Sequence, residues 1–90
     1  MSAAIAAACA LVWREYMLDR TAQDVAGNAV CELVIYEDLG EPRDPFLAFR
    51  EYILLLVDTN RAICVRVDEA ARVMAAEYRR QTTLEKVAAA

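Results

Sequence analysis

The chain has 90 residues, a formal net charge of −4 and an apolar fraction of 59%, against about 45 to 50% in ordinary soluble domains. This length allows one small domain whose core alone is only marginally stabilising, so a second copy of the chain is expected to cover part of the apolar surface. Free DNA and RNA are not expected as ligands, because their phosphates require a basic surface.

The first expected element is a helical arm over residues 3–38, with a break allowed near 20–28. Its alanine-rich beginning, residues 3–12, lacks the basic segment of a signal peptide and is shorter than the roughly 20 apolar residues that cross a bilayer. Thr21 to Asp24 resembles a capping box, and Gly27-Asn28 could be a kink or the turn before a strand over 29–36. No membrane partner is expected.

A loop is predicted over residues 39–44. Gly40 suits a helix C-terminus, and Pro42 and Pro45 prevent the first arm from continuing. Asp44 followed by Pro45 then predicts a helix start, because the carboxylate can cap free N–H groups and proline lacks only an N–H that has no helical partner.

The second expected arm spans residues 45–80, followed by a frayed tail over 81–90. Apolar residues recur in this arm at alternating spacings of three and four, the pattern of a helix that buries one seam against another helix. The residues expected at an oligomer seam are Phe46, Phe49, Ile53, Leu56, Asn60, Ile63, Val67 and Met74. Asn60 would then be a polar seam residue that fixes register and oligomer number.

These elements predict an all-α fold: an antiparallel helical hairpin with a long C-terminal helix, dimerising into a four-helix-type bundle. The alternative is α+β, with a three-stranded antiparallel sheet between two helices. It arises because 52–57 is a continuous apolar run, 58–60 could be a turn and 63–67 is rich in β-branched residues. Asn60 separates the two interpretations, since in the second it is a turn residue.

The composition argues against an enzyme. Histidine is absent, and Ser2 is the one serine, so a Ser-His-Asp triad and a Cys-His nucleophile cannot be built. The two glycines stand far apart and form no phosphate-binding loop. Three separated cysteines without histidine are too few for an ordinary zinc site, and are interpreted as free thiols of a reducing cytoplasm. We therefore expect no catalytic residue, metal or cofactor.

Acidic residues supply the strongest candidate site. Residues 1–58 hold ten acids and four bases (net −6), whereas residues 59–90 hold four acids and six bases (net +2). The acids expected to form a partner-binding face are Glu32, Glu37, Asp38, Glu41, Asp44, Glu51 and Asp58. A negative field of this kind can steer a basic protein and compete with nucleic acid for its binding groove.

Three functions remain open at this point. The first is a small non-enzymatic inhibitor that docks on a larger, basic, nucleic-acid-handling protein, as phage and mobile-element inhibitors of the anti-CRISPR type do; this rests on analogy of size and charge. The second is a sensor bundle with a ligand cavity among Trp13, Tyr16, Tyr52 and Tyr78. The third is a structural subunit of a larger assembly.

Overall fold

The structure is a computed structural model that describes residues 2–16, 21–62, 64 and 66–89. Its elements are the helices α1 (Ser2–Val12), α2 (Thr21–Asp38), α3 (Pro45–Asp58) and α4 (Val67–Ala89), with a short 3₁₀ helix, η1 (Arg14–Tyr16), after α1. No strand occurs among these described residues. The all-α prediction is therefore confirmed, and the α+β alternative is not.

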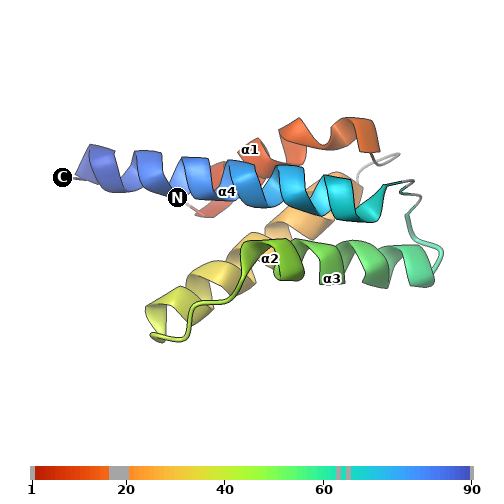
Figure 1. Cartoon of the computed structure of the whole chain (residues 1–90), viewed down its shortest axis with the longest axis horizontal. Helices are drawn as coiled ribbons and strands as arrows, with labels where there is room; N and C mark the ends of the chain where they lie inside the picture. Colours follow the sequence, from red (N-terminus) through yellow and green to blue (C-terminus); the bar gives the residue numbers. More distant parts are fainter. Residues whose placement is uncertain (1, 17–20, 63, 65, 90) are drawn as a thin grey trace.

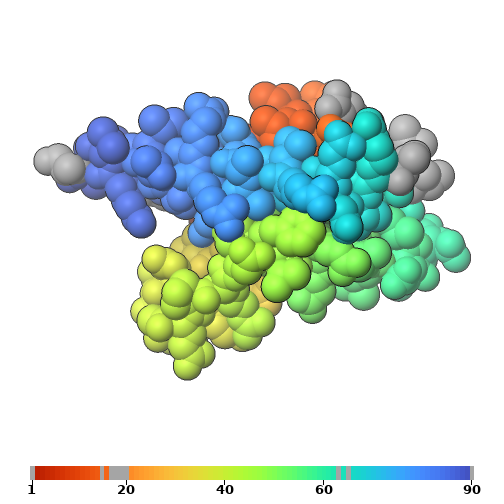
Figure 2. Space-filling view, viewed as in Figure 1, coloured from red at the N-terminus to blue at the C-terminus, as the bar shows by residue number. Residues whose placement is uncertain are grey.

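The four helices enclose one core (Figure 1). Helices α3 and α4 lie side by side and run in opposite directions, and α1 packs along α4 and against α2. Helix α2 crosses behind them and also packs on α3. At one end of the molecule the last turns of α2 and the C-terminal part of α4 project separately, as the space-filling view shows (Figure 2).

The core contains side chains of all four α-helices together with Trp13, which directly follows α1. Trp13, Phe49, Ile53 and Met74 are fully buried, and the rings of Phe49 and Tyr78 meet edge to face with centroids 6.3 Å apart. These bulky side chains fill the space between α1, α3 and α4, while small residues such as the buried alanines of α2 let the helices approach closely.

The unbroken helix expected over 45–80 is in fact two helices, and Asn60 is the reason. Asn60 has a φ of +56°, in the left-handed region that ends helices. Its N–H donates to Val57 O (3.1 Å) and the N–H of Arg61 donates to Leu56 O (2.8 Å), the two bonds of a Schellman motif. Asn60 is thus an exposed turn residue, as the α+β alternative required, but it lies between two helices.

The first arm and the tail also differ from expectation. Helix α2 begins at Thr21, where the sequence allowed a second helix to start, and it passes through Gly27 without interruption; α1 ends earlier, at Val12, and residues 17–20 lie outside the described part of the chain. At the other end α4 continues to Ala89 where a frayed tail was expected over 81–90, and Thr82 Oγ1 donates to the carbonyl of Arg79 within it. The alanines and long side chains of this segment favour a helix.

The loop between α2 and α3 begins and ends at the residues on which its prediction rested, Gly40 and Asp44. Gly40 has a φ of +77°, and the N–H of Glu41 donates to Tyr36 O at 2.9 Å. Asp44 is the N-cap of α3, and its Oδ2 accepts from the N–H of Leu47 at 3.2 Å. Both ends of the loop are therefore fixed by local hydrogen bonds.

The structure places the expected oligomer seam mainly inside one chain. Phe49, Ile53, Leu56 and Met74 are buried, Phe46 and Val67 are half-buried, Asn60 is exposed, and Ile63 is outside the described residues. The spacing that was attributed to a second chain reflects packing of α3 and α4 against α1 and α2. The buried members of this set are therefore not available to a second copy of the chain.

Candidate functional site

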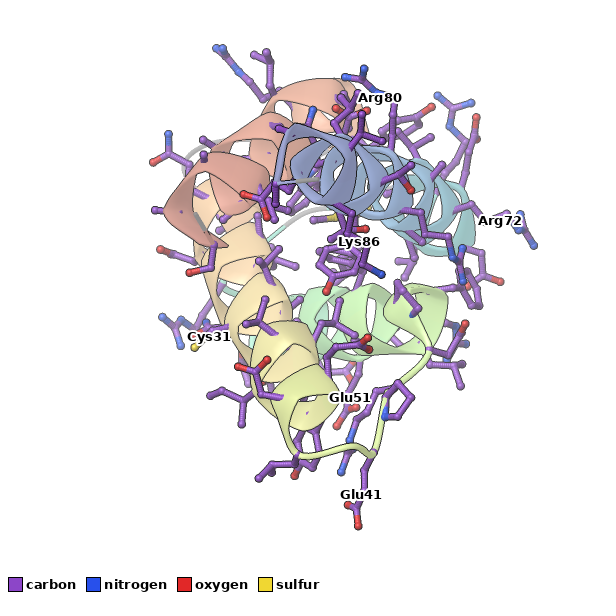
Figure 3. All side chains as sticks on the ribbon, turned by 90° about the vertical axis from the view of Figure 1, so that its left-hand side faces the viewer. Cys31, Glu41, Glu51, Arg72, Arg80 and Lys86 are labelled. Carbon is purple, nitrogen blue, oxygen red and sulfur yellow. The ribbon has the colours of Figure 1, made fainter. Side chains whose placement is uncertain are left out.

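Five acidic residues gather around the end of the molecule where α2 turns into α3. We call them the loop-end acidic surface: Glu32, Glu37, Asp38, Glu41 and Glu51. Glu37 and Asp38 end α2, and Glu41 follows in the loop, where its side chain points away from the helices (Figure 3). Glu32 is half-buried and the other four are exposed. This surface is accessible to a partner.

Tyr52 lies where the acidic residues of α2 and α3 meet. Burial raises the pKa of the Tyr52 hydroxyl, and the negative charges of Glu32 and Glu51 raise it further. One carboxylate comes from each helix, so the antiparallel packing of α2 and α3 brings together charges that are 19 positions apart in the sequence. The guanidinium of Arg43 opposes their effect on this pKa.

The carboxylates at the end of α2 also affect the pKa of Tyr78, which lies on α4. Its pKa is raised first by burial and then by the charges of Glu37, Asp38 and Glu85, with a further contribution from Cys9. The carboxylates at the end of α2 therefore act on α4 as well as facing solvent.

Arg43 is the one basic residue of the loop over 39–44. Its guanidinium stacks on the ring of Tyr36, 3.7 Å from the centroid. This cation–π contact occupies the arginine with an aromatic face rather than with a carboxylate.

Ion pairs within the chain leave the loop-end acidic surface unneutralised. The pairs among the described residues are Arg50–Asp68 (2.8 Å), Arg66–Glu69 (2.9 Å), Arg79–Asp44 (3.2 Å) and Arg80–Glu77 (2.7 Å). Three of the four acids belong to α4, and the fourth is the N-cap of α3. None of the five surface acids has a basic partner within this described part, so their charge remains available to another molecule.

Two of the seven acids predicted for this face do not belong to it. Asp44 is engaged by Arg79 and by the backbone of α3. Asp58 is exposed at the C-terminal end of α3, two helical turns beyond Glu51 and away from the loop. The sequence could not separate these residues from the others, because their neutralisation and position depend on how α3 and α4 pack.

A groove lies between the other ends of α2 and α3, which we call the α2–α3 groove. It has a volume of about 460 Å³. Its α2 wall includes Gln23, Asp24, Gly27 and Asn28, and its other wall includes Tyr52, Leu55, Leu56 and Arg61. Leu55 is 55% exposed, so the groove offers apolar surface to solvent between charged residues.

Sequence reasoning did not find this groove. The one signal was Gly27-Asn28, which had been interpreted as a kink or a strand-initiating turn. Helix α2 is regular there, so Gly27 neither ends the helix nor introduces a strand.

The four aromatic residues proposed to line a ligand cavity are placed apart. Tyr52 lines the α2–α3 groove, whereas Trp13 is fully buried in the core. The Tyr16 hydroxyl donates to Glu69 Oε1 at 3.1 Å, and Tyr78 packs on Phe49. The structure thus gives no support to a shared aromatic cavity.

The cysteines also lie apart. Cys9 is buried, Cys64 is half-buried and Cys31 is exposed on α2 (Figure 3). Within the described ranges no group of three or more cysteine and carboxylate side chains is arranged to hold a metal ion. None of the helices over the described ranges has the length and apolar character needed to cross a bilayer.

Comparisons with known proteins do not assign a function to this surface. The sequence matches no protein-family model, and no curated protein or solved structure shows significant similarity to it.

Proposed function

We propose that the chain is a non-enzymatic binding protein that docks on a larger, basic protein through the loop-end acidic surface. The observation that carries this proposal is the distribution of ion pairs. Asp68, Glu69 and Glu77 of α4 each pair with an arginine, whereas the five carboxylates of the loop-end acidic surface have no such partner among the described residues. Unpaired surface charges of one sign steer and orient an oppositely charged partner.

The shape of this surface also suits docking. Glu41 stands at the tip of a loop whose two ends are fixed by the Gly40 and Asp44 hydrogen bonds, so the carboxylates are held by an ordered backbone. A preordered surface loses less conformational entropy on binding than a flexible tail. Tyr52, between Glu32 and Glu51, adds an aromatic ring that can contact an arginine side chain.

Within this proposal the partner is a nucleic-acid-handling protein of the cytoplasm, and the chain acts as its inhibitor. A channel that holds nucleic acid is positively charged because it binds backbone phosphates. A compact acidic protein can occupy such a channel in place of the phosphates. This is the mode of action expected of an anti-CRISPR-type inhibitor.

The test measures target-DNA binding by a panel of purified RNA-guided interference complexes, using a labelled DNA duplex. The wild-type chain should suppress DNA binding by at least one complex. The variant Glu37→Lys/Glu41→Lys should require at least tenfold more protein for half-inhibition. Equal inhibition by this variant, or no inhibition of any complex in the panel, would contradict the proposal.

A matched control separates the position of the charges from net charge. Asp58→Lys/Ala76→Lys/Thr83→Lys changes the net charge by the same +4 at exposed positions outside the loop-end acidic surface. This control should inhibit like the wild type. A parallel loss of inhibition in both variants would show that only the overall charge matters and would overturn the assigned surface.

A further inference from the structure

We propose that the α2–α3 groove is a self-association site, at which two copies of the chain pack about a two-fold axis. The groove borders the loop-end acidic surface, with Tyr52 beside both, but the proposal rests on Gly27, Asp24 and Arg61 and does not depend on that surface. Three properties of the groove support it: a glycine that the chain's own packing does not require, two unpaired charges of opposite sign, and exposed apolar side chains.

Gly27 provides the first argument. It lies in the interior of α2, where glycine is less stable than alanine because of its greater backbone entropy in the unfolded chain. A Cβ built on Gly27 would meet no atom of the described residues within 4 Å, so nothing in the chain itself needs the space. A glycine on an exposed helix face lets another backbone approach closely, as small residues do where two helices cross.

Charge complementarity identifies the occupant. Asp24 and Arg61 both line the groove, and neither makes an ion pair within the described part of the chain. In a two-fold contact the same patch meets itself, so Asp24 of each copy can face Arg61 of the other. A single groove that carries one unpaired acid and one unpaired base is therefore suited to a second copy of itself.

The apolar surface needed for association is present around these charges. Leu55 is 55% exposed in the groove wall, and Tyr52 beside it is half-buried. Ile35, 51% exposed, lies seven residues from Asn28 and so on the same face of α2. Self-association would cover this surface in a chain whose apolar fraction, 59%, is high for its size.

A dimer formed in this way would present its acidic ends outward. Gly27 and Glu37 are ten residues apart on α2, which corresponds to about 15 Å along the helix. Each copy would keep the loop end of its acidic surface (Glu37, Asp38 and Glu41) free, so that the dimer could engage two basic sites at once and gain avidity.

The test is a charge-exchange experiment read by light scattering and sedimentation equilibrium. The wild type should have the mass of a dimer. Asp24→Arg and Arg61→Asp should each shift dissociation to at least tenfold higher concentration, because each variant places like charges opposite one another twice. An equimolar mixture of the two variants should regain the dimer. In the mixed dimer the two substituted side chains face each other with opposite charges, and so do the two unchanged ones.

Two control variants outside the groove and one further variant within it test whether the effect is specific to the groove. Glu41→Arg and Arg14→Asp make the same charge changes at exposed residues outside the groove and should leave the dimer intact. Gly27→Ala should raise the thermal stability of the monomer yet weaken the dimer at least tenfold. A wild type that stays monomeric when concentrated for sedimentation, or a mixture that stays as dissociated as its components, would overturn the proposal, whatever the inhibition assay shows.

Discussion

Asp44 connects the first turn of α3 to the middle of α4 through Arg79. Its Oδ1 accepts from Arg79 Nη2 at 3.2 Å, while its Oδ2 accepts from the backbone N–H of Leu47 at the same distance. One carboxylate thus caps a helix and joins two residues that are 35 positions apart. The two roles can be separated by substitution.

Asp44→Ala should lower the free energy of unfolding by about 1 to 2 kcal/mol, because the N-cap is lost. Arg79→Ala should cost less than about 1 kcal/mol, since an exposed ion pair contributes little. Asp44→Asn keeps a capping oxygen and should behave like Arg79→Ala. Urea unfolding followed by circular dichroism measures all three. A cost for Arg79→Ala equal to that of Asp44→Ala would show that the ion pair, not the cap, dominates.

Asn60→Leu should destabilise the chain by about 1 kcal/mol, because leucine tolerates the left-handed backbone poorly. Asn60→Gly should be neutral or stabilising, since glycine adopts this conformation freely. Thermal melts of the two variants give the comparison. A seam residue would respond in the opposite sense, with leucine raising the melting temperature, so that result would contradict the Schellman turn.

The three thiols should react at very different rates. Burial raises the pKa of Cys9 to about 12, and the charge of Glu77 contributes further. At pH 8 only on the order of one Cys9 thiol in ten thousand is then ionised. Burial also raises the pKa of the half-buried Cys64, whereas Cys31 is exposed. Iodoacetamide should therefore label Cys31 first, Cys64 next and Cys9 only after unfolding.

Mass spectrometry of timed, quenched samples identifies the labelled positions. The variant Cys31→Ser should remove the fast phase and leave the other two rates unchanged. Rapid labelling of Cys9 in the folded chain would mean that α1 does not remain packed on α4.

Glu77 should contribute stability that disappears in acid. Hydrogen bonds from the Arg80 guanidinium, at 2.7 and 3.0 Å, lower the pKa of Glu77, opposed by burial and helped by the Gln81 amide. A lowered folded-state pKa stabilises the fold above the unfolded-state pKa, and this stabilisation is lost as the pH falls through the folded-state pKa.

Glu77→Gln should therefore lower the Tm by about 2 to 5 °C at pH 7, and this difference from the wild type should shrink as the pH falls below the ordinary glutamate value of 4.5. Glu85→Gln is the control, because Glu85 makes no hydrogen bond to the described residues, and at pH 7 it should change the Tm less than Glu77→Gln does. A Glu77→Gln difference that is constant with pH would contradict the assigned interaction.

Local chemistry was readable from the sequence where it depended on a few adjacent residues. Gly40 and the Asp44-Pro45 pair indicated the loop, and both hold the conformation expected of them. Asn60 was ambiguous because the same apolar spacing continues across it: Leu56 and Val67 both pack on the core from separate helices. Two helices joined by a turn give the same apolar spacing as one continuous helix when the apolar faces of both helices point toward the same core.

The sequence predicted an acidic surface near the loop, but it did not determine which of the acidic residues belong to it. Glu37, Asp38 and Glu41 are neighbours in sequence, so their grouping required no tertiary information. The approach of Glu32 and Glu51 to the same tyrosine and the withdrawal of Asp44 depend on how α2, α3 and α4 pack. The α2–α3 groove likewise requires two helices in contact, and the pattern of a single segment does not specify it.

Trp13 gives this protein a built-in reporter. It is the one tryptophan, it has no exposed surface, and no described residue accepts a hydrogen bond from its indole N–H. Its emission should be blue-shifted in the native state and should move to longer wavelength when the core opens. Since the indole lies beneath the surface, binding at the loop or at the groove should leave this signal nearly unchanged. Fluorescence can therefore verify, in the same cuvette, that a variant that has lost binding is still folded.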